Sequence, residues 1–296
     1  MNNVLLPPGF YDLTGASAKK HFFILKYCIE YFANRDYNLI IPSLFEYDVS
    51  NEDQNSIKVV DPVNNQVMNI RNDITSQISR IWKQGDSKEI SKFCYYGDVI
   101  YRNKSDNSSN FSRKLTQAGI EYIADSSLER DLEILKIVLE IMEGLKISEF
   151  SVLLSFPNLF GSYCTLLNLN DEECEELRGF LLNKNITAIK DSKYSDLVDF
   201  IIPGSFDSDD VKIKGLEKEI SAVQELIDSY KTAFSNIDII IDPFYVRNYS
   251  YHTDFVFSIV SHKLKRTIAR GGSYNIIENQ SAVGSSFYIE ELSRCI

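Results

Sequence analysis

Polar side chains suited to binding a small ligand gather in two short segments in the first half of the 296-residue chain. Residues 71–75 read Arg-Asn-Asp-Ile-Thr. The carboxylate of Asp73 and the hydroxyl of Thr75 could bind an ammonium group there, or could simply cap a helix. Gln117 and Glu121 lie four residues apart, so in a strand they share one face. If that face is buried, Glu121 needs a cationic or hydrogen-bonding partner, whereas a solvated edge strand requires none.

Two further polar segments lie in the last fifth of the chain. Arg247 is followed within five residues by two tyrosines and a histidine. A forked guanidinium beside ring side chains suits a ligand with a carboxylate and a ring, but a surface arginine among packing tyrosines gives the same pattern. Residues 270–274 read Arg-Gly-Gly-Ser-Tyr. A Gly-Gly turn at Gly271 and Gly272 would let a ligand approach the backbone closely.

Composition narrows the class of protein. The chain has 31 Lys and Arg against 42 Asp and Glu, a net charge of −11, which disfavours binding to nucleic acid. Five scattered cysteines and three histidines indicate neither a disulfide framework nor a metal site. No Walker loop, nucleophile elbow, HExxH or GxGxxG motif occurs. With no signal peptide and no run of about 18 apolar residues, the sequence predicts a cytoplasmic protein with a metabolite or protein partner and no cofactor.

Hydrophobic spacing predicts the elements that must position these segments. Helices are expected at residues 17–34, 74–83, 126–144, 170–182, 194–202 and 211–234. Strands are expected at residues 39–41, 93–101, 115–123, 150–156, 237–241, 254–260 and 266–269, and in a hairpin over 57–70 with its turn at 61–66. Residues 282–295 are expected to form a strand and then a helical turn.

Two of these elements carry a local signal at one end. Pro42 stops the strand at 39–41, which reads as buried. Ser126 and Glu129 form a capping-box pattern at the start of the helix over 126–144. The order of elements favours an α+β fold, an antiparallel sheet flanked by helices. We expect a single domain over 1–296 with a mostly helical insertion at 157–235.

Taken in order, the segments resemble the core of histidyl-tRNA synthetase, which has the class II aminoacyl-tRNA synthetase fold, over essentially the whole chain. The segments that carry the resemblance are YFANRDYNLIIPSLFEY, IRNDITSQISRI, YYGDVIYR through QAGIE, VRNYSYHTDFVF, IARGGSYN and VGSSFYIEEL. The opening LLPPGFYDL and the Asp-Ile-Thr-x-Gln pattern at 73–77 are more similar to a paralogous family, the regulatory subunits of ATP phosphoribosyltransferase.

The departures from the synthetase pattern concern ATP. Where the synthetases have a motif 2 glutamate and a phosphate-facing motif 3 arginine, this chain has Lys104 and Glu291. A carboxylate in place of that arginine would repel a triphosphate. The chain also stops at Ile296, soon after motif 3, so we expect no anticodon-binding domain and no catalytic residues.

The resemblance implies that a histidine-like pocket is partly retained. Asp73, Thr75 and Gln117 would meet the ammonium group, Arg102 and Arg247 the carboxylate, and Glu121 the imidazole. The full set of implied ligand-binding residues is Asp73, Thr75, Arg102, Gln117, Glu121, Arg247, Tyr251, His252, Gly271, Gly272 and Tyr274.

Some positions of this pocket depart from the family's pattern or admit another interpretation. His252 stands where the synthetases usually have a tyrosine, and Ser273 and Asn275 replace an arginine and an aspartate. Arg102 and Arg247 could also hold a remnant pocket together by ion pairs with Asp73 or Glu121.

The resemblance implies a non-catalytic subunit that activates a short-form ATP phosphoribosyltransferase catalytic subunit in a hetero-octamer. Histidine would act on that complex as a feedback effector of the first step of histidine biosynthesis, and the chain would pair with itself as a dimer through motif 1. Two alternatives stay open. The chain could be a truncated synthetase paralogue that still activates an amino acid, or a scaffold that senses nothing.

Overall fold

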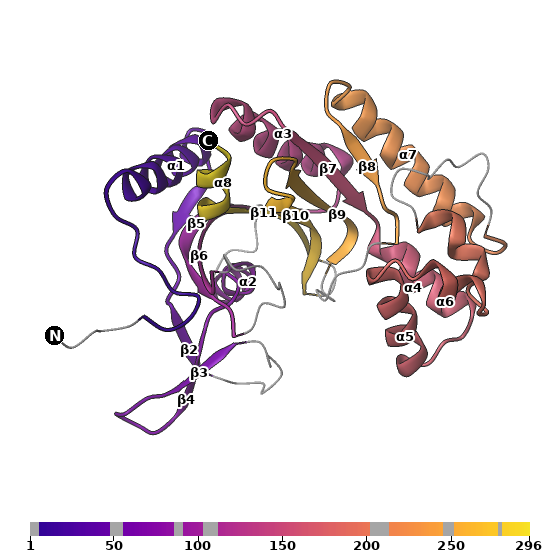
Figure 1. Cartoon of the computed structure of the whole chain (residues 1–296), viewed down its shortest axis with the longest axis horizontal. Coiled ribbons are helices and arrows are strands. Elements are labelled where there is room, and N and C mark those ends of the chain that lie inside the picture. The colour runs from indigo at the N-terminus through magenta and orange to yellow at the C-terminus, as the bar shows by residue number, and fades with distance from the viewer. Residues whose placement is uncertain are drawn as a thin grey trace. The chain divides into compact units, whose positions relative to one another are not determined.

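The computed structural model describes residues 6–47, 56–85, 91–102, 112–201, 213–244, 252–277 and 280–296 (Figure 1). The chain divides into two compact units. Unit 1 comprises Met1–Ile123, Ile141–Lys146 and Gly284–Ile296, and unit 2 comprises Ala124–Glu140 and Ile147–Val283. A single-domain organisation therefore stays a prediction.

Unit 1 is built from helices and strands near both ends of the chain. Its elements are α1 (Gly15–Ala33), β1 (Asn38–Ile40), β2 (Phe45–Tyr47), β3 (Ile57–Val60), β4 (Val67–Ile70), α2 (Thr75–Gln84), β5 (Ser91–Ile100), β6 (Lys114–Ile123) and α8 (Ile289–Cys295). Unit 2 is richer in helix. Its elements are β7 (Phe150–Ser155), α4 (Pro157–Leu166), α5 (Asp171–Leu182), α6 (Ile186–Lys190), the 3-10 helix η1 (Ser195–Phe200), α7 (Glu217–Ala233), β8 (Ile239–Ile241), β9 (His252–Ser261) and β10 (Arg266–Ile277). Helix α3 (Leu128–Gly144) and strand β11 (Gln280–Tyr288) have residues in both.

The described strands form two sheets. The larger has eight strands in the order β1-β5-β6-β11-β10-β9-β7-β8, and the smaller has three in the order β2-β4-β3. Strand β6 is antiparallel to β5, and β9 is antiparallel to both β10 and β7. The edge pairs β1–β5 and β7–β8 are parallel. This largely antiparallel sheet, with helices packed against it, confirms the predicted α+β class.

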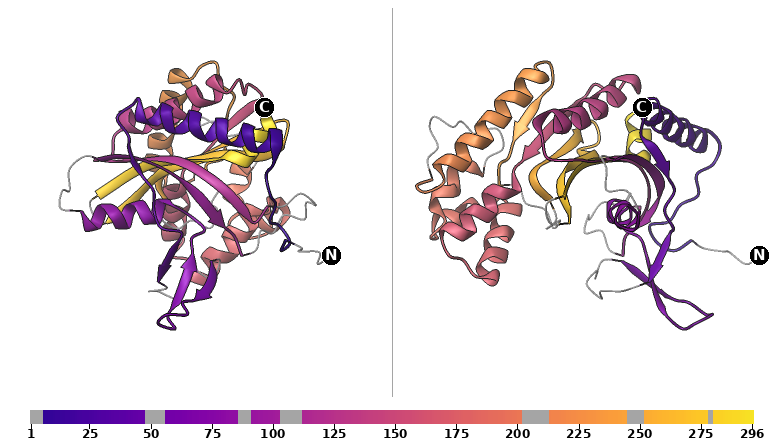
Figure 2. Two further views of the ribbon diagram at one scale, coloured as in Figure 1. Left: turned by 90° about the vertical axis from the view of Figure 1, so that its left-hand side faces the viewer. Right: turned by 180° about the vertical axis from the view of Figure 1, so that it is seen from behind.

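Helices α1 and α2 cover opposite faces of strands β5 and β6 (Figure 2). On α1, the buried residues Ile24, Cys28 and Phe32 recur every fourth position. This spacing confirms the predicted amphipathic helix, whose apolar stripe points to the sheet. On α2, Ile78 packs with Tyr95 of β5 in a separate buried cluster.

The prediction of a buried strand at residues 39–41 is wrong for the single chain. Strand β1 pairs only with β5 among the described strands, at an edge of the sheet. Leu39 is 48% exposed and Ile41 is 63% exposed. Three adjacent apolar residues predict burial only if both faces are covered, and an edge strand leaves part of its surface open.

The predicted hairpin over 57–70 is confirmed. Strands β3 and β4 pair antiparallel, with Val60 opposite Val67. The backbone N–H of Asp61 donates to the carbonyl of Gln66 over 2.8 Å, and Asn65 has a positive φ of 59°. The polar turn residues therefore supply the turn chemistry that the sequence indicates.

The predicted capping box of Ser126 and Glu129 is wrong by one residue. Helix α3 begins at Leu128, and the hydroxyl of Ser127 accepts a hydrogen bond from the backbone N–H of Arg130 over 3.2 Å. Ser126 lies before the cap and its hydroxyl donates to Asp254 over 3.5 Å. Two adjacent serines offer the same cap chemistry, and the tertiary contact of Ser126 decides between them.

The described residues of segment 157–235 are mainly helical, as the sequence predicts. Aromatic side chains of this segment pack with Phe244, which follows it in the chain. The ring of Phe244 lies edge-on to Phe200, with centroids 5.2 Å apart, and edge-on to Tyr163, with centroids 6.1 Å apart. Edge-to-face pairs of this kind add specificity to the burial of apolar area.

Candidate functional site

Glu121 is the buried centre of the candidate site in unit 1. Its side chain lies on β6 and the residue is 1% exposed. The hydroxyl of Thr75, the first residue of α2, donates to Glu121 Oε1 over 2.8 Å. The interpretation of β6 as a solvated edge strand is therefore wrong. The alternative prediction, a buried carboxylate with a hydrogen-bonding partner, is confirmed.

Tyr95 of β5 extends this hydrogen-bonded group. Its hydroxyl donates to Glu121 Oε1 over 3.4 Å and lies 2.7 Å from the hydroxyl oxygen of Ser286. Burial, with the nearby carboxylates of Glu121 and Asp73, raises the pKa of Tyr95 well above its usual value. Tyr95 is therefore a neutral donor beside a carboxylate.

Gln117 lies on the same face of β6 as Glu121 and is 3% exposed. Its Oε1 atom is buried and accepts no hydrogen bond from any residue in the described ranges. A buried amide oxygen without a donor costs free energy, which a ligand N–H could recover. The two polar residues that the sequence placed on one face thus combine an acidic acceptor with an open amide acceptor.

Gly284 of β11 makes room for the Glu121 carboxylate. A Cβ at this position would lie 1.8 Å from Glu121 Oε2 and 2.7 Å from the backbone oxygen of Ile120. We expect Gly284→Ala to lower the free energy of unfolding by about 1–3 kcal/mol, because the methyl overpacks a buried site. Chemical denaturation would measure this loss. Gly161→Ala on α4 is the matched control, because nothing lies within 4 Å of a Cβ added at this position. A similar loss of stability in that variant would contradict the steric explanation.

The predicted N-cap role of Asp73 is off by one residue, because the N-cap of α2 is Ile74, but the Asp73 side chain still contacts the start of the helix. Its Oδ2 accepts a hydrogen bond from the backbone N–H of Ser76 over 3.4 Å, one residue into α2. The carboxylate thus contacts the positive end of the helix dipole. Binding of a ligand ammonium by Asp73 stays a prediction. Arg102 is exposed, and its predicted contact with a ligand carboxylate also stays a prediction.

The remaining predicted site residues belong to unit 2. Arg247 and Tyr251 lie outside the described residues, as does Lys104 of unit 1. His252 is the first residue of β9, and its backbone pairs with that of Tyr274, which is buried.

The prediction of a Gly-Gly turn is wrong. Strand β10 runs from Arg266 to Ile277, well past the predicted end at residue 269. Gly271 pairs with Phe257 and Gly272 with Val256, so both glycines lie inside the strand. The register shifts directly after Gly272, which marks a bulge. Glycine inside a strand is typical of such a position.

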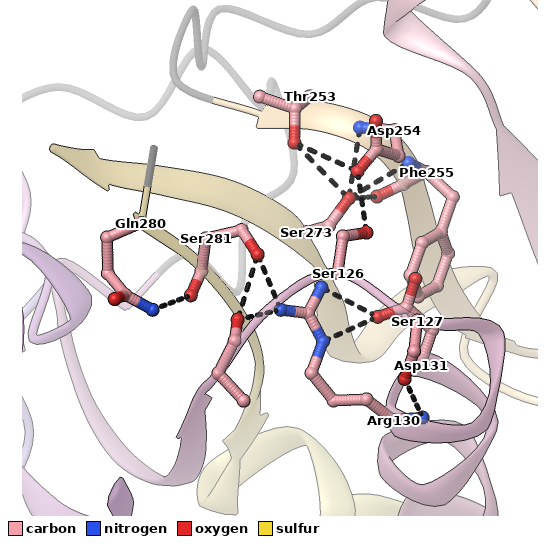
Figure 3. Close-up of polar contacts among 11 residues, drawn as sticks. Ser126, Ser127, Arg130, Asp131, Thr253, Asp254, Phe255, Ser273, Gln280 and Ser281 are labelled. Carbon is pink, nitrogen blue, oxygen red and sulfur yellow. Dashed lines mark hydrogen bonds and ion pairs between the residues drawn. The ribbon is translucent and has the colours of Figure 1, made fainter. Parts of the chain in front are cut away.

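Ser273, at that bulge, has a structural contact (Figure 3). It is fully buried, and its hydroxyl oxygen accepts hydrogen bonds from the backbone N–H groups of Asp254 and Phe255 over 3.0 and 3.1 Å. A bulge removes ladder partners from the neighbouring strand, and this hydroxyl replaces them. Ser273 therefore accepts hydrogen bonds from the β9 backbone at the position where the synthetase pattern has an arginine.

Glu291, the motif 3 departure, is buried within α8. It is 6% exposed, and Arg294 Nη1 donates to its Oε1 over 2.9 Å. The neighbouring Glu290 accepts two contacts from the backbone N–H of Thr116, at 3.0 and 2.8 Å. This corner of unit 1 therefore carries carboxylates held by the chain's own donors.

Sequence reasoning did not single out Tyr95, Ser286 or Gly284. Alternation along β5 could have placed Tyr95 on the face that α2 covers. No local signal marks Gly284, which approaches Glu121, or Ser286, which contacts Tyr95, because both lie on β11 and reach the site only through the pairing of distant strands.

Fold and site together define a class II aminoacyl-tRNA synthetase-like core. The family model described as histidyl-tRNA synthetase matches residues 9–292, so the chain belongs to that family. A chain from Bacillus halodurans described as an ATP phosphoribosyltransferase regulatory subunit/histidyl-tRNA synthetase shares the fold. It has a TM-score of 0.83 and 19% identity, over 99% of this chain and 83% of that one.

A relative and a further solved structure have names that refer to ATP phosphoribosyltransferase. The ATP phosphoribosyltransferase regulatory subunit of Paramagnetospirillum magneticum is 23% identical, over 98% of this chain and 81% of its own length. A chain of the ATP phosphoribosyl transferase (HisG:HisZ) complex from Thermotoga maritima has a TM-score of 0.68 and 16% identity. That match covers 91% of this chain and 97% of that one.

Proposed function

We propose that this protein is a regulatory subunit of ATP phosphoribosyltransferase that acts with a short-form catalytic subunit in the first step of histidine biosynthesis. Relatives of that name match 92% or more of the chain. Binding of the catalytic subunit is supported by the fold shared with a chain of the Thermotoga maritima complex.

The observation that carries this proposal against amino-acid activation is Glu291. The synthetase pattern requires a cation at this position to meet the triphosphate, and here a buried carboxylate already holds Arg294 at 2.9 Å. A carboxylate facing a triphosphate at contact distance costs on the order of several kcal/mol in a partly shielded site. We therefore expect the subunit to perform no catalysis of its own.

Histidine is the proposed effector, bound by the retained pocket residues. Glu121 would accept the imidazole N–H, and the open Oε1 of Gln117 would accept an ammonium N–H. Thr75 already shares the Glu121 carboxylate, at 2.8 Å. A feedback effector must bind the inhibited and active assemblies with different affinity, since equal binding shifts nothing.

Self-association through motif 1 is part of the proposal. In unit 1, large apolar side chains of α1 and β1 lie open to solvent: Phe22 is 66% exposed, Phe23 58% and Leu39 48%. Exposed apolar area of this kind is typical of a subunit interface. A dimer formed in this way would be the building block of the hetero-octamer.

Among helices of the described residues, none combines the length and apolar character needed to cross a membrane. The proposed site of action is the cytoplasm.

The direct test mixes the protein with a short-form catalytic subunit and follows phosphoribosyl-ATP formation with and without histidine. The mass of the protein alone and of the mixture is recorded in parallel. We expect a dimer alone, a larger complex with the partner, a raised rate and inhibition by histidine. No association and no change in rate would overturn the proposal.

Glu121→Gln should separate sensing from assembly. The variant keeps the shape and a hydrogen-bond acceptor but loses the charge, and a hydrogen bond to a charged group contributes about 1.5–3 kcal/mol. We therefore expect histidine inhibition of the complex to need roughly 10–100 times more histidine, with the mass of the complex unchanged. Glu129→Gln on the exposed side of α3 is the control. If Glu121→Gln responded to histidine as the wild type does, Glu121 would not be a histidine-binding residue.

The second candidate is a truncated synthetase paralogue that activates an amino acid. The Thr75–Glu121 hydrogen bond at 2.8 Å, which joins two residues of the proposed amino-acid pocket, is the observation in its favour. Histidine-dependent exchange of pyrophosphate into ATP would support it. No exchange at protein concentrations that saturate a synthetase control would exclude it.

A further inference from the structure

The side chain of Tyr95 lies across strand β6 in unit 1. Its partner in the register of β5 and β6 is Gly119, where an added Cβ would overlap the ring and the hydroxyl of Tyr95. The missing side chain therefore leaves the space that the buried ring occupies. Glu121 lies two residues along β6 from Gly119, so it is the diagonal neighbour that a long side chain can reach. Glycine at position 119 thus lets the Tyr95 hydroxyl approach the Glu121 carboxylate.

The hydrogen bonds of the Tyr95 hydroxyl have one consistent direction. Its single proton is donated to Glu121 Oε1 over 3.4 Å, because an ionised carboxylate only accepts. The contact of 2.7 Å between the hydroxyl oxygens of Tyr95 and Ser286 then uses the proton of Ser286. Ser286 lies on β11 and is half-buried. The donors therefore form a chain that runs from Ser286 through Tyr95 to Glu121.

Both oxygens of the Glu121 carboxylate are held in place. Oε1 accepts a hydrogen bond from Thr75 over 2.8 Å in addition to the one from Tyr95. Oε2 lies against Gly284 of β11, where an added Cβ would overlap it. Hydrogen bonds to an ionised acceptor are stronger than those between neutral groups, so two donors on one oxygen restrict rotation of the carboxylate. An acceptor held in this way is pre-organised for a ligand donor that approaches from a fixed direction.

We propose that Tyr95, held by Ser286, is a positioning residue that orients the Glu121 carboxylate to accept a hydrogen bond from a ring N–H of the bound ligand. This inference rests on the proposed function, in which an amino-acid effector occupies the pocket. Tyr95 then determines specificity through Glu121. It strengthens the binding of a ligand that has a ring N–H, and it contributes little to a ligand whose ring has the same size but no donor.

The test compares the binding of histidine with that of 2-thienylalanine, whose ring has a similar size but no N–H. Each ligand is titrated by calorimetry into the complex of the full-length protein with the catalytic subunit. For Tyr95→Phe we expect histidine to bind about 3–10 times more weakly, because only the hydroxyl is lost and the ring still fills its space. The affinity for 2-thienylalanine should change by less than about twofold. The mass of the complex should stay unchanged.

A control and a second variant accompany Tyr95→Phe. Tyr96→Phe is the matched control, because Tyr96 is the next residue of β5 and its side chain points to the opposite face of the strand. It should bind both ligands as the wild type does. Ser286→Ala removes the donor to Tyr95 but keeps the tyrosine, and it should weaken histidine binding about 2–3 times. In the Tyr95→Phe background the same change should have no further effect, since Ser286 acts through the Tyr95 oxygen.

Equal losses for the two ligands in Tyr95→Phe would overturn the proposal, because Tyr95 would then support the pocket as a whole. An unchanged affinity for histidine would overturn it as well. If Tyr95→Phe failed to form the complex, the same comparison of the two ligands in Ser286→Ala would decide. A wild-type complex that bound no histidine would overturn the proposed effector together with this inference, and that result is distinct from a wrong role for Tyr95.

Discussion

Arg71→Met is expected to lower the free energy of unfolding by about 3–5 kcal/mol. Arg71 is 9% exposed and lies directly after β4. Its Nε donates to the backbone oxygen of Asp98 over 2.7 Å. Its Nη1 donates to the backbone oxygens of Pro42 and Ser43 over 2.8 and 3.3 Å, and to Gln77 Oε1 over 3.2 Å. One side chain thus joins the segment after β1, strand β5 and helix α2.

Methionine fills a similar volume but donates nothing, so the oxygens of Pro42, Asp98 and Gln77 would lose this donor. The oxygen of Ser43 would keep the Gln77 amide, which donates to it over 2.9 Å. The unpaired acceptors, rather than the lost volume, account for the size of the effect. Arg71→Lys keeps the charge, but a single ammonium cannot reproduce the guanidinium fork, so it should recover only part of the loss. Gly97 shows how closely the fork is held, since a Cβ there would lie 1.9 Å from Arg71 Nη2.

Chemical denaturation monitored by circular dichroism would measure the change. Arg80→Met is the control, because Arg80 is 43% exposed and pairs with Glu46 at the surface, where ion pairs contribute about 0–1 kcal/mol. If Arg71→Met lay within that surface range, Arg71 would not be the link between the three elements.

The second large effect is expected for Arg130→Met in unit 2, also about 3–5 kcal/mol. The guanidinium of Arg130 is 2% exposed and holds Asp131 Oδ1 at 3.0 Å. It also donates to the backbone oxygen of Ala124 over 2.7 Å and to the hydroxyl of Ser281 over 2.8 Å (Figure 3). Without Arg130, the Asp131 carboxylate would be buried without its cation.

The pH dependence of this pair gives the prediction a second readout. Burial raises the pKa of Asp131 from 3.8 to about 6, although Arg130 lowers it. The folded protein therefore holds this proton more tightly than the unfolded chain. This tighter proton binding stabilises the folded protein fully below about pH 4, and the stabilisation is lost as the pH rises through 6. The free energy of unfolding changes by about 3 kcal/mol over this range.

Arg130→Met should raise the pKa of Asp131 further, so the loss of stability in this variant should grow between pH 4 and 7. The double variant Arg130→Met, Asp131→Asn should recover much of the loss at pH 7, because no charge is then buried. Lys136→Met on the exposed side of α3 is the control. A loss of the same size at pH 4 and pH 7, with no recovery in the double variant, would show that packing and not charge explains the effect. Equilibrium unfolding at several pH values measures the free energy of unfolding of the wild type, of both Arg130 variants and of the control.

Local patterns were sufficient to predict most of the elements. The stripe through Ile24 and Cys28 predicted α1, and the polar turn at 61–66 predicted the β3–β4 hairpin. Each of these signals lies within one turn of helix or one strand pair, where neighbours along the chain are also neighbours in space. The end points were less well predicted. Strand β10 extends eight residues past its predicted end at 269, to Ile277, because its pairing with β9 continues across the glycines.

The candidate site was predicted in part. Gln117 and Glu121 share a buried face because the two-residue period of a strand is a local property. The partners of Glu121 could not be predicted in the same way. Thr75 lies 46 positions away in the chain, and Tyr95 lies 26 positions away. Only the packing of α2 on the β5–β6 pair brings them together.

The sequence by itself determined the family, the α+β class and the shared face of Gln117 and Glu121, because ordered motifs and periodicity are local. Only the tertiary structure decided which groups contact one another. It assigned Ser273 to the β9 backbone and left Leu39 exposed at a sheet edge. The physical reason is that burial and hydrogen bonding depend on which surfaces meet, and that follows from the packing of distant segments.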